Sequence, residues 1–160
     1  MAFILTDQLD EDPQGSFAKY WRYLDQNRHR FPPGALSLVD SDWYFSDDPR
    51  NPHDAWLESA TITEHSSGER HEERWTSITL KLLGAYHDGH LVFHYPRVFS
   101  YSFDTHNSSR GHLDWRYNEF RLSEENHLIH EIEWCGPQPT ARWIIESDDV
   151  KCQWLPLEDS

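Results

Sequence analysis

Basic residues are scarce in this chain of 160 residues, where 14 Lys and Arg stand against 28 Asp and Glu, a net charge of −14. A negative field of this size repels nucleic acids and anionic membranes and attracts basic protein surfaces. We therefore expect neither nucleic acid nor membrane as a partner. Residues 124–160 carry nine acidic and two basic side chains, a net of −7, so half of the excess lies in this last segment.

Cysteines and long apolar runs are also largely missing. Cys135 and Cys152 are the two cysteines; they are too few for a zinc site of their own, and we expect them to stay reduced in a cytosolic chain. No run of residues approaches the roughly 20 apolar positions of a membrane-spanning helix. The N-terminus turns acidic too early for a secretory signal, so the expected location is cytoplasmic.

Aromatic residues, in contrast, are abundant. They make up 14% of the chain, although hydrophobic residues in total reach only 37%. Because each aromatic side chain buries a large area, we expect an aromatic core. No repeat or linker divides the sequence, which predicts a single domain over residues 1–160 with frayed ends at 1–14 and 156–160.

One amphipathic helix is predicted from Ser16 to Arg30. Four large apolar side chains fall at helical spacing on one face, namely Phe17, Tyr20, Trp21 and Leu24. Ser16 is positioned to cap the start of this helix, and Pro32 and Pro33 are expected to end it.

Alternating polar and apolar residues dominate the rest of the chain. Residues 35–45 predict a strand, with a helix as the alternative, and a polar loop follows to residue 54. Further strands are predicted at residues 56–64, 75–83, 90–95, 97–103, 117–122, 128–134, 142–146 and 150–154. Pro96 lacks a backbone donor and indicates an edge position or a bulge. Short turns between neighbouring strands predict an α+β fold, a predominantly antiparallel β-sheet with one N-terminal amphipathic helix.

The eleven histidines suggest a metal site, but their spacing argues against one. The candidates are His87, His90, His94, His106 and His112. His90 and His94 share a strand face but stand about 13 Å apart along an extended chain, too far to hold one ion. We therefore expect no metal and no other cofactor.

Signs of an active site are few. The sequence contains no Gly-rich phosphate loop, no G-x-S-x-G elbow and no zinc-binding H-E-x-x-H. A general acid and base could form from Asp114, Glu119 and His130 if the strands at 117–122 and 128–134 pair. Alternation offers another explanation, because Glu119 falls on a polar face and His130 on an apolar one. A buried, hydrogen-bonded histidine is the commoner outcome there, so the chain is more easily understood as a protein without catalytic activity.

Two acidic stretches are typical of protein interfaces. The first surrounds aromatic residues with carboxylates, and its candidate partner-binding residues are Asp40, Asp42, Trp43, Tyr44, Asp47 and Asp48. The second is a turn that contains Glu146, Asp148 and Asp149. Aromatic side chains supply desolvated contact area, and flanking carboxylates pair with Arg or Lys of a partner. The alternative is that the aromatic residues belong to the core while the acids face solvent.

Three further stretches carry a resemblance to a known class of proteins: residues 52–58 (PHDAWLE), 82–89 (LLGAYHDG) and 114–120 (DWRYNEF). Together with the compact length and the acidity, they resemble the small immunity proteins that bacteria encode beside polymorphic toxins of the contact-dependent, Rhs and type VI secretion kinds. The resemblance implies one-to-one inhibition of a cognate toxin that offers a basic surface, without turnover. It assigns a role to no individual residue.

Two other functions stay open. One is a small hydrolase that reverses a toxin's modification, and the other is a β-protein that self-associates without a toxin partner.

Overall fold

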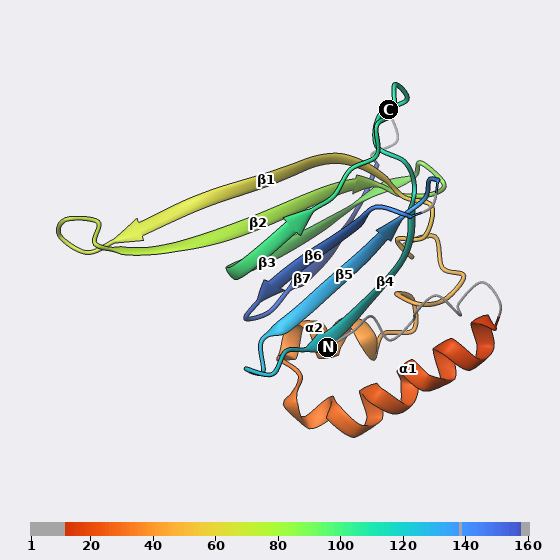
Figure 1. Cartoon of the computed structure of the whole chain (residues 1–160), viewed down its shortest axis with the longest axis horizontal. Helices are drawn as coiled ribbons and strands as arrows, with labels where there is room; N and C mark the ends of the chain where they lie inside the picture. Colours follow the sequence, from red (N-terminus) through yellow and green to blue (C-terminus); the bar gives the residue numbers. More distant parts are fainter. Residues whose placement is uncertain (1–11, 138, 158–160) are drawn as a thin grey trace.

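The computed structural model describes residues 12–137 and 139–157. Helix α1 (Pro13–Asn27) leads through the 3-10 turn η1 (Arg28–Arg30) to helix α2 (Pro33–Val39). Seven strands follow: β1 (Trp56–Ser67), β2 (Glu73–Leu83), β3 (Gly89–Phe103), β4 (Trp115–Leu122), β5 (Leu128–Trp134), β6 (Arg142–Ser147) and β7 (Lys151–Pro156). The predicted α+β class with a predominantly antiparallel sheet is confirmed (Figure 1).

The expected frayed ends fall largely on residues 1–11 and 158–160, which lie outside the described residues. Among the described residues of the expected ends, residues 13 and 14 belong to α1 and β7 extends to Pro156.

The sheet is organised around the long strand β3. The strand order is β1-β2-β3-β6-β5-β4, and β7 pairs with β3 on the same side as β6. Residues 89–94 of β3 pair with β7, whereas residues 98–103 pair with β6. Between these halves, the register of β3 against β2 shifts by one residue next to Pro96. Pro96 therefore sits at a bulge, as predicted, and the edge alternative is wrong because β3 is a central strand.

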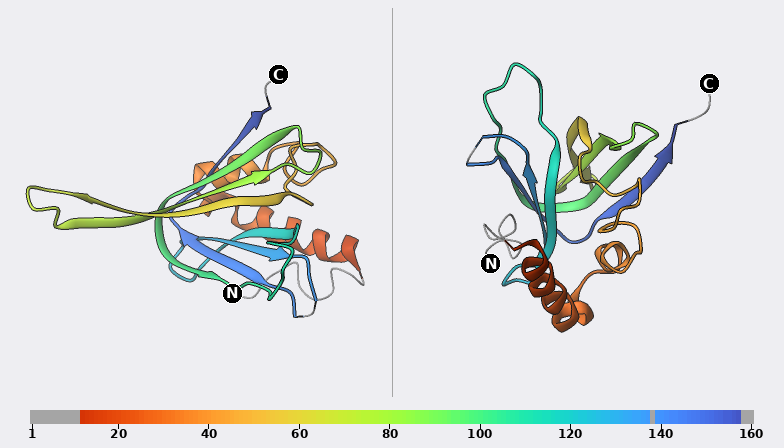
Figure 2. Two further views of the ribbon diagram at one scale, coloured as in Figure 1. Left: turned by 90° about the horizontal axis from the view of Figure 1, so that it is seen from above. Right: turned by 90° about the vertical axis from the view of Figure 1, so that its right-hand side faces the viewer.

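The sheet curls strongly (Figure 2), and side chains from strands far apart in the strand order meet across its concave face. The ring centroids of Phe93 on β3 and Trp115 on β4 lie 5.3 Å apart, although β6 and β5 separate these strands. Tyr44, from the loop after α2, packs against Phe93 at 6.2 Å and against Phe120 at 5.7 Å. The predicted aromatic core thus lies between the curled sheet and the N-terminal third of the chain.

Helix α1 begins earlier than the sequence predicts. Asp12 is the N-cap, and its Oδ1 accepts the N–H of Gly15 at 3.1 Å, while Pro13 occupies the first turn. Proline suits that position because the first helical N–H groups have no partner inside the helix. The predicted cap at Ser16 is therefore wrong, and Ser16 lies buried inside the helix.

The strand predicted at residues 35–45 is wrong, and the helical alternative holds for its first part. Pro33 starts α2, and Asp149 from the β6–β7 turn accepts the N–H groups of Gly34 and Ala35 at 2.9 Å each. A distant carboxylate thus caps the helix, a contact that local sequence does not reveal. Ala35 and Leu38, three residues apart, are buried on one face. No helix among the described residues combines the length and apolar character needed to cross a bilayer.

Helix α1 covers the outer edge of strand β4 with tyrosine hydroxyls. The Tyr20 hydroxyl donates to the C=O of Phe120 at 2.7 Å and accepts the N–H of the same residue at 2.8 Å. The Tyr23 hydroxyl accepts the N–H of Leu122 at 2.8 Å. Edge strands expose unpaired backbone groups that invite association with other chains. The two hydroxyls replace a neighbouring strand.

We expect Tyr20→Phe to lower the free energy of unfolding by about 2 kcal/mol, because it leaves the buried N–H and C=O of Phe120 without their partner. Urea denaturation would measure the loss. The control is Tyr101→Phe, since Tyr101 is about half exposed on β3. Equal stability of the two variants would show that the Tyr20 hydroxyl does not stabilise the edge of β4.

Strands β1 and β2 extend past the rest of the sheet as a two-stranded arm (Figures 1 and 2). Because β2 pairs with β3 only from Thr76 to Leu83, the distal part of the hairpin pairs only with itself. Residues 58–64 are exposed. At the base of the arm, the ring of His65 stacks on Trp75 at 5.3 Å and the guanidinium of Arg97 lies 5.2 Å from the same indole.

Candidate functional site

A cleft of about 400 Å³ opens where α1, the loop before β1, the β2–β3 turn and the start of β4 meet. Its aromatic lining consists of Phe17, Phe45, Tyr86, Trp115 and Tyr117, and its acidic lining of Asp47, Asp48 and Asp54. This volume lies within the range of sites for small ligands or single inserted side chains. The combination of aromatic faces and carboxylates suits a cation.

Backbone hydrogen bonds hold the acidic wall in place. The N–H of Asp54 donates to the C=O of Trp115 at 2.7 Å, and the N–H of Trp115 donates to the C=O of Ala55 at 3.0 Å. Asp54 has a φ of 65°, a left-handed conformation that Asp tolerates better than most residues. The loop is thereby fixed to the first residue of β4.

The charge balance of the cleft is negative. Arg50 donates to both carboxylate oxygens of Asp48 at 2.8 Å, and these hydrogen bonds, with that of the Arg50 backbone N–H, lower the pKa of Asp48 to about 2. Asp48 therefore stays ionised at any physiological pH. Arg116 also lines the cleft, with its guanidinium 5.2 Å from the Tyr117 ring. With Asp48 paired to Arg50, the carboxylates of Asp47 and Asp54 still outnumber this one lining guanidinium.

His53 adds one hydrogen-bond acceptor to the acidic wall. Its Nδ1 contacts the C=O of Arg116, so Nδ1 carries a proton, and the ring stacks on Tyr117 at 5.6 Å. In the neutral ring Nε2 is then an acceptor, and it lies 3.6 Å from Oδ1 of Asp54. Acceptors this close together suit a group with several donors, such as a guanidinium.

Asn118 connects the cleft to a buried polar network. Its Oδ1 accepts from the Tyr44 hydroxyl at 2.6 Å and from Nε2 of His130 at 2.9 Å. Nδ1 of His130 in turn accepts from the Tyr95 hydroxyl at 2.5 Å. Both ring nitrogens are satisfied by a neutral imidazole, and burial lowers the pKa of His130 well below its ordinary value. His130 therefore supports the core beneath the cleft.

The three residues considered for acid–base catalysis are not brought together. Glu119 pairs with Nη1 of Arg121 at 3.1 Å, and Nη2 of that arginine pairs with Glu131 at 2.8 Å on the same sheet face. His130 lies on the opposite face in the aromatic network. Asp114 precedes β4, where its C=O accepts the N–H of Cys135.

The histidines considered for a metal contact separate partners. On β3 and the turn before it, His87 packs edge-on against Trp56, His90 pairs with Glu58, and His94 hydrogen-bonds Thr79. His106 accepts the N–H of Ala141, and His112 packs against Trp134 and Trp143. Cys135 and Cys152 are free thiols, and burial raises the pKa of both.

Comparisons of the chain with protein families, with curated proteins and with solved structures find no match.

Only part of the first acidic stretch reaches the cleft. Asp47 and Asp48 line it, and Asp42 is exposed. Tyr44 is fully buried in the core, which corresponds to the alternative in which the aromatic residues are structural.

The other two residues of that stretch have local partners. Asp40 forms an ion pair with Arg28. Trp43 is partly buried beneath Arg50, whose guanidinium lies 5.2 Å from the indole ring.

The second acidic stretch lies away from the cleft. Glu146 pairs with Nδ1 of His127 at 3.0 Å, and Asp149 caps α2. Asp148 is exposed, and its N–H donates to the C=O of Arg97.

The three stretches that carry the resemblance converge on the cleft. Residues 53 and 54, 85 and 86, and 115–118 all line it, although about 60 positions separate the first from the last. No role was predicted from the sequence for His53, Asp54 or Tyr86. Their presence in the stretches 52–58 and 82–89 was the available signal.

Proposed function

We propose that this chain is an immunity protein that binds a cognate bacterial toxin one to one and neutralises it without turnover. The cleft is the observation that carries this proposal. Its carboxylates and aromatic rings offer an Arg or Lys side chain of the toxin both charge-assisted hydrogen bonds and cation–π contacts. The net charge of −14 would steer a basic partner towards it.

Two further features support a binding role. The stretches that resemble immunity proteins line this same cleft, so the resemblance and the chemistry point to one surface. The β1–β2 arm offers additional exposed area beyond the body of the sheet (Figure 1). Against the hydrolase alternative, Glu119 and His130 lie on opposite faces of β4–β5.

The test is co-expression with the toxin encoded beside this gene. We expect cell survival and a one-to-one complex on gel filtration with light scattering. Absence of both protection and a complex would refute the proposal. An oligomer of the chain alone, without a toxin complex, would favour self-association.

Within that complex, the cleft can be tested by charge changes. We expect Asp47→Lys with Asp54→Asn to slow association with the toxin by about tenfold, more at low salt, because steering depends on local charge. Asn keeps the left-handed backbone at position 54 accessible. Stopped-flow fluorescence at several salt concentrations would measure the rate.

The control is Glu124→Lys with Asp104→Asn, which changes the net charge equally at exposed positions outside both the cleft and the β1–β2 arm. We expect it to associate at close to the wild-type rate. Equal slowing by both variants would indicate that overall charge, and not the cleft, attracts the toxin.

A further inference from the structure

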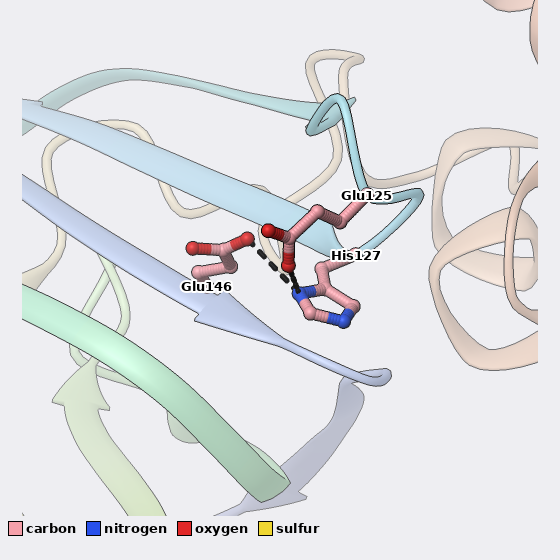
Figure 3. A group of neighbouring side chains, drawn as sticks. All are labelled: Glu125, His127 and Glu146. Atoms are coloured by element: carbon pink, nitrogen blue, oxygen red, sulfur yellow. Dashed lines mark hydrogen bonds and ion pairs between the residues drawn. The ribbon is translucent and has the colours of Figure 1, made fainter.

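A His–carboxylate cluster joins the β4–β5 turn to strand β6, away from the cleft. Nδ1 of His127 lies 3.0 Å from Oε1 of Glu146 and 3.7 Å from Oε2 of Glu125. Figure 3 shows both carboxylates turned towards this one ring nitrogen. Of the residues that the structure describes, these three form the one group of potential metal ligands whose ligand atoms all lie within 4.8 Å of one another.

These spacings fit a tetrahedral ion. Zinc binds histidine nitrogen and carboxylate oxygen at about 2.0–2.2 Å, which separates neighbouring ligand atoms by about 3.3–3.5 Å. The two distances from His127 Nδ1 bracket that value. The side chain of Glu125 is 78% exposed, so it can rotate to complete the triangle, whereas those of His127 and Glu146 are 27% and 23% exposed.

The surroundings hold two of the three ligands in position. The Ser100 hydroxyl donates to Oε2 of Glu146 at 3.1 Å, which leaves Oε1 facing the histidine. The Phe99 ring stacks on the His127 ring with centroids 3.8 Å apart and planes 15° apart. Outer contacts of this kind fix ligand orientation in zinc proteins.

The turn that carries two of the ligands is itself well defined. The Ser123 hydroxyl accepts the N–H groups of Glu125 at 3.2 Å and His127 at 3.0 Å. Asn126 between them has a φ of 63°, a conformation that Asn tolerates. Glu125 and His127 therefore project to the same side before any ion arrives.

We propose that Glu125, His127 and Glu146 bind one Zn²⁺, with a fourth position open to water. A mixed nitrogen and oxygen set suits Zn²⁺, whereas Mg²⁺ and Ca²⁺ prefer oxygen ligands. The ion would replace the proton that now lies between Nδ1 and Glu146, so affinity falls as pH falls. The ion ties the β4–β5 turn to β6 and stabilises the sheet. The site is independent of toxin binding, because none of the three residues lines the cleft.

Calorimetric titration of the chelator-treated, tag-free chain with Zn²⁺ tests the proposal. We expect one Zn²⁺ per chain with a micromolar Kd, a higher melting temperature, and no competition by excess Mg²⁺. With Co²⁺ we expect the visible absorption of a tetrahedral centre.

The variants locate the ion. His127→Ala and Glu146→Gln should each weaken binding by more than about 100-fold, and Ser100→Ala by about tenfold. His90→Ala is the matched control, because His90 pairs with the single carboxylate of Glu58 at 2.8 Å. It should bind Zn²⁺ like the wild type. No saturable Zn²⁺ binding below about 1 mM would overturn the proposal, because a Kd above about 1 mM corresponds to a binding free energy of at most about 4 kcal/mol. Undiminished Zn²⁺ binding by His127→Ala and Glu146→Gln would also overturn it.

Discussion

Arg121→Ala is expected to lower the free energy of unfolding by about 3–5 kcal/mol, because it removes the guanidinium that lies between two buried carboxylates. Glu131 then keeps the partly exposed Arg142, whose Nη1 lies 3.4 Å from its Oε2. Arg121 lies between Glu119 and Glu131, and the side chains of all three are at most 4% exposed. Total stabilities of single domains are about 5–15 kcal/mol, so this loss approaches unfolding. Urea denaturation monitored by tryptophan fluorescence would measure it.

The control for Arg121→Ala is Arg74→Ala, which breaks an exposed pair with Glu64 at 3.8 Å and should change stability by less than about 1 kcal/mol. A second variant separates charge from packing. Glu131→Gln should cost less stability in the Arg121→Ala variant than in the wild-type chain, since in the variant it also removes one of two like charges that no longer share Arg121. An equal cost in both chains would indicate that lost packing and not charge explains the effect of Arg121→Ala.

The stability of the chain is expected to fall as pH decreases below about 6.5, with His130 as one source. Burial lowers the pKa of His130 well below its ordinary value, so the folded chain keeps this imidazole neutral while the unfolded chain takes up a proton. The stabilisation is complete above the unfolded pKa of about 6.5. It then decreases by up to about 1.4 kcal/mol per pH unit until the folded pKa is reached.

The His130 contribution can be isolated by comparing slopes. We expect the unfolding free energy of His130→Gln to depend less steeply on pH than that of the wild type, whatever its stability at neutral pH. The difference in slope corresponds to the uptake of up to one proton on unfolding, or about 1.4 kcal/mol per pH unit. Burial also lowers the pKa of His112. Because His112 is present in both the wild type and His130→Gln, its contribution to the two slopes cancels when they are compared. His29→Gln, at an exposed position of η1, should keep the wild-type slope. Identical slopes for wild type and His130→Gln would contradict the neutral, buried imidazole.

Local alternation predicted the faces of strands correctly where the two faces differ in polarity. On β4, Glu119 and Arg121 lie on one face while Phe120 stacks under His130 at 4.0 Å on the other. The apolar face assigned to His130 is its observed face. Period-two patterns succeed here because strand geometry places alternate side chains on opposite faces irrespective of distant contacts.

Prediction from the sequence was wrong for short segments whose periodicity is ambiguous. The five residues from Ala35 to Val39 fit either period, and the decision for a helix came from the carboxylate of Asp149, more than 100 residues away. Similarly, Ser16 and Asp12 are both good N-caps, and the Asp12-Pro13 pair places the start of α1 earlier.

The sequence alone determined the acidic charge, the aromatic core and the antiparallel strands, because each follows from composition or from contacts between near neighbours in the chain. The tertiary structure alone decided which residues meet. The curl of the sheet brings Phe93 to Trp115, the cleft assembles three separate stretches, and the pairing of β5 with β6 sets His127 beside Glu146. These contacts depend on strand order, register and curvature, and those are properties of the whole sheet that no local pattern encodes.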